Sequence, residues 1–76
     1  MEIKEFIENF AAQFDETDAT EITATTEFKN LAEWSSLMAL SIIAMADEEY
    51  DVQLKGDDIR NATTVEDLFN VIKAKK

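Results

Sequence analysis

The stretch from Trp34 to Tyr50 constrains the fold more than any other part of the sequence. It contains no Gly and no Pro, is rich in strong helix formers, and begins with two serines, which are favoured at helix N-caps. The pattern predicts a helix over residues 36–50. At about 100° per residue, one broad apolar arc lies on a single side and is expected to face the core: Leu37, Ala39, Leu40, Ile43, Ala46 and Tyr50.

A second stripe follows the same helix at spacings of three, four and three residues: Met38, Ser41, Met45 and Glu48. Two interpretations of this stripe stay open. Either the helix is central and buried on most sides, or the stripe is a surface that meets partners transiently. The second interpretation is favoured by methionine, which is flexible, polarizable and common on binding surfaces.

Apolar periodicity predicts two more long helices. The first runs for three to four turns and buries a stripe with spacings of three and four residues: Ile3, Phe6, Ile7, Phe10 and Phe14. The last begins at a capping box, either Thr63 with Glu66 or, in a second register, Thr64 with Asp67. Its inward stripe is predicted to be Val65, Leu68, Phe69 and Ile72.

The segment between Asp15 and Ser35 loses the helical period and gains threonines. A short strand over residues 20–25 would have no partner strand, so we predict a loop. Because a loop of this length needs anchoring in a compact domain, four apolar residues are expected to pin it: Ile22, Phe28, Leu31 and Trp34. It does not fit an EF-hand, which needs Gly sixth and Glu twelfth, and we predict no metal site.

The connection after the central helix contains Gly56, the only glycine, which predicts a turn with positive φ. Asp57 or Asp58 then caps a short helix with Ile59 turned inward. These elements predict one all-α domain over residues 1–76, a small four-helix bundle of three longer helices and one short helix, with a long first loop. The predicted core is Phe6, Phe10, Phe14, Phe28, Leu40, Ile43, Tyr50, Leu54, Ile59, Val65, Leu68, Phe69 and Ile72.

Composition excludes several classes of function. Without Cys or His the chain lacks a thiolate, the commonest general base and the commonest metal ligand, so we expect no enzymatic activity of its own. A net charge of −10 repels nucleic acid and anionic membranes and favours basic partners. The longest apolar run is too short to span a bilayer and no secretory signal is evident, so we expect a cytoplasmic monomer.

The junction between the loop and the central helix resembles that of the acyl carrier protein family. In that family an Asp-Ser-Leu run opens the second helix, and its serine carries 4′-phosphopantetheine. Ser36 and Leu37 match this run, with Ser35 in place of the aspartate. Residues 48–52 (Glu-Glu-Tyr-Asp-Val) match the close of that helix, and three residues match its apolar approach: Phe28, Leu31 and Trp34.

The resemblance implies a freestanding acyl carrier. A phosphopantetheinyl transferase would move 4′-phosphopantetheine from coenzyme A to Ser36, and the thiol of this arm would hold acyl intermediates, as in fatty acid or polyketide synthesis, as thioesters. Acyl-transferring and acyl-modifying enzymes with basic or apolar docking surfaces would be partners. The partner surface is predicted to be Ser35, Leu37, Met38, Ser41, Met45 and Glu48.

One further expectation concerns the salt dependence of binding at this surface. Family members often carry acidic side chains along it, whereas this chain has Met38 and Ser41, so we expect apolar contacts that depend little on salt.

The alternative function is an unmodified acidic helical interaction module, in which Ser36 only caps the helix.

Overall fold

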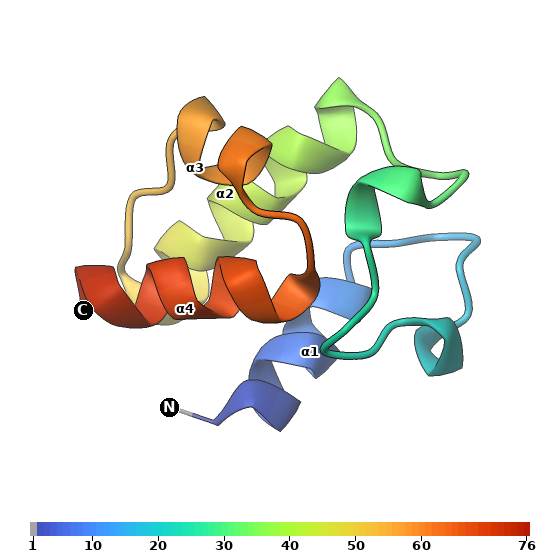
Figure 1. Cartoon of the computed structure of the whole chain (residues 1–76), viewed down its shortest axis with the longest axis horizontal. Helices are drawn as coiled ribbons and strands as arrows, with labels where there is room; N and C mark the ends of the chain where they lie inside the picture. Colours follow the sequence, from blue (N-terminus) through green and yellow to red (C-terminus); the bar gives the residue numbers. More distant parts are fainter. Residues whose placement is uncertain (1) are drawn as a thin grey trace.

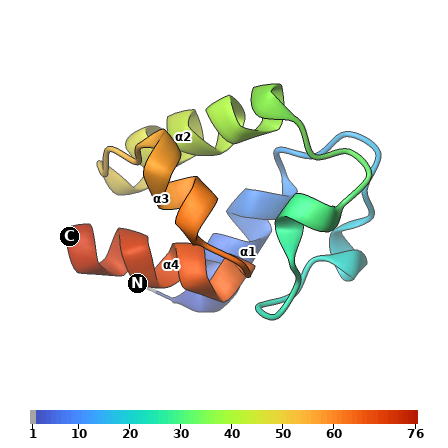
Figure 2. The same cartoon turned by 45° about the horizontal axis from the view of Figure 1, so that its top comes forward.

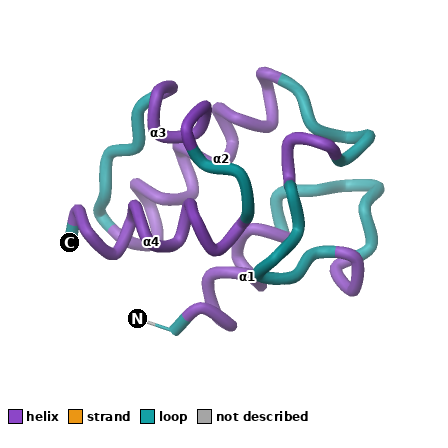
Figure 3. The backbone as a smooth tube through the Cα atoms, viewed as in Figure 1, coloured by secondary structure: helices purple, strands orange, loops and turns teal. Residues whose placement is uncertain are grey.

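The computed structural model describes residues 2–76, which contain helices and loops but no strand (Figure 3). The predicted all-α architecture is confirmed. The helices are α1 (Ile3–Ala11), α2 (Ser36–Tyr50), α3 (Gly56–Asn61) and α4 (Val65–Lys75), with two short 3-10 helices at Ala19–Glu21 and Phe28–Asn30. The bounds predicted for the central helix are confirmed, and α3 is the short one.

The helices surround one core. Helix α1 packs against both α2 and α4, and α3 lies between α2 and α4 (Figures 1 and 2). The long first loop forms the end of the molecule opposite the C-terminus (Figure 1). This arrangement places the N-terminal end of α2 beside the loop on one side and beside α3 on the other.

The core is built mainly from aromatic and branched side chains, as predicted. Eleven of the thirteen predicted core residues are buried. The largest fully buried side chains also include Ile42, which was not predicted; the others are Phe6, Phe10, Phe28, Leu68, Ile72 and Val65. The Phe6 ring lies 5.9 Å from that of Phe10 and 5.7 Å from that of Phe69. The phenylalanines of α1 therefore join the other helices into one cluster.

The predicted orientation of α2 is right for Ala46 and Tyr50, which are buried, and wrong for the two leucines of the arc. Leu40 is 61% exposed and Leu37 is 75% exposed, while Ile43 is half-buried. The buried residues of α2 are Ile42, Met45, Ala46 and Tyr50. Because apolar residues occur all around the first three turns, periodicity could not determine which side faces inward.

The long first loop is held by side chains and by backbone hydrogen bonds. Ile22 and Phe28 are buried, and Leu31 and Trp34 pack against the core, which confirms all four predicted anchors. The loop carbonyls of Ala24 and Thr26 also accept the backbone N–H groups of Glu66 and Val65, at 2.9 and 3.1 Å. These bonds satisfy donors that the first turn of α4 would otherwise leave unpaired.

The structure corrects several predicted helix ends. Helix α1 ends at Ala11 and is shorter than predicted, although Phe14 is still buried beyond it. Gly56 does not have positive φ; it begins α3, and Lys55 occupies the N-cap. Asp58 instead accepts the Lys55 N–H at 2.9 Å.

Specific side chains explain the C-terminal end of α2 and the N-terminal end of α4. Asp51, with φ of 56°, closes α2 in the left-handed conformation, which aspartate tolerates better than most residues. At α4 the second capping register is the correct one. Thr64 accepts the Asp67 N–H at 3.2 Å and the Asp67 carboxylate accepts the Thr64 N–H at 3.0 Å, so Thr63 with Glu66 is wrong.

The orientation of α2 predicts that two neighbouring apolar residues contribute very differently to the free energy of unfolding. Ile42→Ala removes a fully buried side chain and is expected to lower the free energy of unfolding by about 2–5 kcal/mol. Leu40→Ala is expected to change it by less than about 0.5 kcal/mol, because most of Leu40 is in solvent. Urea unfolding followed by circular dichroism measures both. Equal losses in the two variants would contradict this orientation.

Candidate functional site

The two serines before α2 have different positions. Ser35 is the N-cap: its backbone is extended, and its hydroxyl oxygen accepts the Met38 N–H at 3.3 Å. Ser36 is the first residue of the helix and is exposed. Its hydroxyl makes no hydrogen bond to any part of the chain from residue 2 to 76. The capping role considered for Ser36 therefore belongs to Ser35.

The residue before the two serines anchors them to the core. Trp34 stacks on Phe10, with ring centroids 6.5 Å apart and an interplanar angle of 6°. It also meets Phe28 edge-on, at 4.9 Å. Because the indole is held by rings from α1 and from the loop, the start of α2 has a defined position beside α1.

Glu33 holds the loop on the other side of this anchor. Its carboxylate accepts the backbone N–H groups of Asp15, Glu16 and Thr17, at 2.7, 3.0 and 2.9 Å, and also the Thr17 hydroxyl at 2.9 Å. The backbone hydrogen bond from Asp15, followed by the other bonds from the loop, lowers the pKa of Glu33 because these bonds favour the charged form. Glu33 therefore ties the end of α1 to the approach to Ser36.

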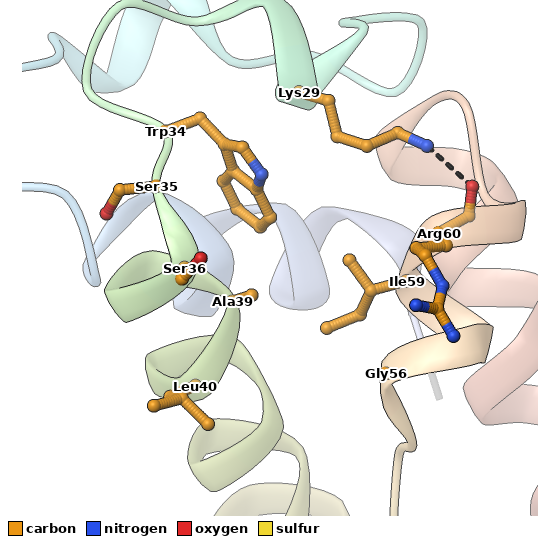
Figure 4. A pocket seen from close by; sticks show the side chains of 9 residues that line it. All are labelled: Lys29, Trp34, Ser35, Ser36, Ala39, Leu40, Gly56, Ile59 and Arg60. Carbon is orange, nitrogen blue, oxygen red and sulfur yellow. Dashed lines mark hydrogen bonds between the residues drawn. The ribbon is translucent and has the colours of Figure 1, made fainter.

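A cleft of about 500 Å³ opens beside Ser36, between the start of α2 and α3 (Figure 4). Its walls are mainly apolar and come from Trp34, Ala39, Leu40 and Ile59. Lys29 and Arg60 line the side opposite the two serines, and the Lys29 ammonium donates to the Arg60 carbonyl oxygen at 2.7 Å (Figure 4).

The predicted partner residues do not form one continuous surface. Ser35, Leu37 and Glu48 are exposed, and Met38 and Ser41 are half-buried. Met45 is 3% exposed and belongs to the core, so its assignment to a partner surface is wrong. The cause is the orientation of α2, whose buried residues are Ile42, Met45, Ala46 and Tyr50.

Sequence reasoning missed three side chains of the cleft. Leu40 was assigned to the core, although its apolar neighbours allowed either orientation. Arg60 lies 24 residues after Ser36, and Lys29 lies in the loop seven residues before it, so no helical or capping pattern associates either residue with Ser36. Among residues 2–76 the structure contains no group of three metal-ligating side chains. No helix in the same range is long and apolar enough to cross a membrane.

One of three comparisons with known proteins found a match. A family model described as a phosphopantetheine attachment site matches residues 5–72, which is most of the chain. Comparison with curated proteins and with solved structures found no match. The matched region includes Ser36, its capping neighbour and every wall of the cleft.

The Glu33 contacts predict a pH-dependent contribution to stability. Because the folded-state pKa of Glu33 is lowered, its contribution is complete above the ordinary value of 4.5 and is lost as the pH falls through the folded-state pKa. Glu33→Gln should therefore be less stable than the parent protein at pH 7, and the difference should shrink in acid. Urea unfolding between pH 7 and pH 3 measures it.

The matched control is Glu16→Gln, which changes an exposed carboxylate in the same loop. Its stability should follow the parent protein across this pH range. Parallel curves for Glu33→Gln and the parent protein would show that the Glu33 carboxylate does not contribute through these hydrogen bonds.

Proposed function

The chain belongs to the phosphopantetheine attachment family, and on this basis we propose that Ser36 is the residue that carries the 4′-phosphopantetheine arm. Domains of this family carry that prosthetic group and are not catalysts themselves. The observation that supports Ser36 most directly is the division of roles at the helix start. Ser35 supplies the cap, while the adjacent hydroxyl is exposed and has no other role in the described structure.

The residues around Ser36 fit a phosphodiester. The first-turn N–H groups of a helix carry partial positive charge, which favours a bound phosphate. No acidic side chain lies in the first turn of α2, so none opposes this charge. The aromatic anchor at Trp34 and the Glu33 contacts hold the junction in place, and the serine is presented at an ordered surface.

The attachment step is a phosphoryl transfer from coenzyme A. The Ser36 oxygen forms a bond to the phosphorus of the phosphopantetheine group, the pyrophosphate bond of coenzyme A breaks, and adenosine 3′,5′-bisphosphate leaves. The transferase accepts the hydroxyl proton, and Mg²⁺ neutralises developing charge. Once attached, the arm supplies a thiol that holds cargo as a thioester.

We propose that the cargo is an acyl group and that residues 1–76 act as a single carrier domain. The sequence before the serine favours this class, because peptidyl carriers usually have glycines there and this chain has Leu31-Ala32-Glu33-Trp34. Tethering raises the local concentration of cargo at a partner enzyme. The chain needs no catalytic group of its own for this role, consistent with its lack of His and Cys.

Attachment is tested by intact mass after incubation with coenzyme A, Mg²⁺ and a broad-specificity phosphopantetheinyl transferase. The parent protein should gain one phosphopantetheine. Ser36→Ala should gain none, because it lacks the accepting oxygen. Ser35→Ala should still be loaded, although loss of the cap should lower its stability by about 1 kcal/mol.

Two outcomes would contradict the proposal. Loading of Ser36→Ala would move the attachment site elsewhere. Failure to load the parent protein with several transferases would favour the alternative, an unmodified acidic interaction module in which neither serine is modified. Circular dichroism of each variant confirms that it is folded before the mass is measured.

We propose that partner enzymes dock on an apolar patch formed by Leu37 and Leu40. They are the exposed large hydrophobic residues of the described chain, and both lie within four residues of Ser36. No charged residue occurs between Trp34 and Ala46, in a chain of net charge −10. Burial of these two side chains would contribute by the hydrophobic effect, which salt does not screen as it does charge pairs.

The transferase itself serves as the test partner. Leu40→Ser should lower its kcat/KM for loading by about fivefold or more, the loss typical of a central contact residue. Raising salt from low to high concentration should change the value for the parent protein much less. Glu48→Gln is the matched control, since it changes an exposed residue at the far end of α2. A steep salt dependence with an unaffected Leu40→Ser would contradict this docking surface.

A further inference from the structure

The cleft beside Ser36 differs in charge from the rest of the protein. The chain has seventeen acidic and seven basic residues, yet two basic residues, Lys29 and Arg60, line this one cleft. No carboxylate from residues 2–76 is among its lining side chains. The cleft therefore has mainly apolar walls and one locally positive side, on an otherwise acidic molecule.

Both cations have donors available for a ligand. The Lys29 ammonium donates one hydrogen bond to the Arg60 carbonyl oxygen and has three N–H groups, so two remain. This bond holds the ammonium at the cleft between the Phe28–Asn30 turn and α3. The Arg60 guanidinium pairs with Asp57, but both side chains are about three-quarters exposed, and such a pair is easily exchanged for another anion.

The positions of Ser36, the apolar walls and the two cations determine what kind of ligand fits the cleft. Ser36 lies on one side of the cleft and the two cations on the other, with the Trp34 ring and Ile59 between them (Figure 4). The cargo is joined to Ser36 through the phosphopantetheine arm, so the arm must fold back over the cleft before the acyl group can lie against the apolar walls and reach the cations. A phosphate directly on Ser36 would lie at the near side, away from Lys29 and Arg60.

We propose that this cleft binds the cargo of the carrier and selects acyl groups whose far end bears a carboxylate. The methylene chain of such a cargo packs against Trp34, Leu40 and Ile59, and its carboxylate is placed at Lys29 and Arg60. A neutral acyl group of the same length makes the apolar contacts but brings no anion to the two cations. This inference rests on the attachment of the arm to Ser36.

The test compares two cargoes of equal length on the same protein. The transferase loads Ser36 with the arm from glutaryl-coenzyme A, from pentanoyl-coenzyme A or from coenzyme A itself. Amide NMR shifts of Lys29, Ile59 and Arg60, and the Trp34 indole N–H, report on the cleft. Glutaryl should move all four signals, pentanoyl should move mainly Trp34 and Ile59, and the bare arm should leave Lys29 and Arg60 unchanged.

Thioester lifetime gives a second readout. Cleavage by hydroxylamine, normalised to the same acyl groups on free pantetheine, should be about two- to fivefold slower for the loaded glutaryl group than for pentanoyl, the size expected from an exposed ion pair. Lys29→Gln and Arg60→Gln should each reduce this difference. Lys73→Gln, an exposed residue of α4 outside the cleft, is the matched control.

The outcomes separate this inference from the proposed function. If Ser36 is loaded but glutaryl and pentanoyl produce equal shifts and equal lifetimes, the cargo selection is wrong and the carrier role stands. If the bare arm alone moves Lys29 and Arg60, the anion at the cations is the phosphodiester, and the cargo selection is again wrong. If Ser36 is never loaded, both proposals fail.

Discussion

The position of Trp34 determines the geometry of the whole site. Its half-buried indole packs against Phe10 from α1 and Phe28 from the loop, with ring centroids at 6.5 and 4.9 Å. Burial of these rings offsets the entropy lost in ordering a long first loop. The same indole is a wall of the cleft and precedes the capping serine by one residue. Packing of the core and presentation of Ser36 therefore depend on the same contacts.

Replacement of the usual aspartate by Ser35 changes the charge at the helix start but retains its cap. Serine and aspartate are among the best N-cap residues, because each accepts a first-turn N–H. Ser35 does so through Met38. An aspartate would add a negative charge next to the proposed phosphodiester, whereas serine adds none. The structural role of the family position is thus preserved, and its electrostatic role is absent.

Sequence reasoning predicted the elements well and their orientation less well. The bounds of α2 followed from helix formers and capping serines, the loop anchors from the few apolar residues in a polar loop, and nearly all of the core from periodicity, because most helices have one apolar face. It was wrong for Leu40 and Met45, since the first turns of α2 are apolar on every side. It could not associate Lys29 or Arg60 with Ser36, because only the packing of α3 against the loop brings these residues together. Local patterns indicate burial, but they do not specify a cleft between the start of α2, the loop before it and α3.

The acidic surface and the exposed apolar residues of α2 contribute to binding over different distances. The net charge of −10 acts over the Debye length, about 10 Å at 0.1 M salt, and can increase the rate of encounter with basic partners. The first turns of α2 have no charged residue between Trp34 and Ala46, so contacts made on this part of the helix gain little from that attraction. In the proposed carrier role, the acidic surface would accelerate encounter without choosing among basic partners. Discrimination would then come from the fit to Leu37 and Leu40, because only a complementary apolar surface removes both side chains from water.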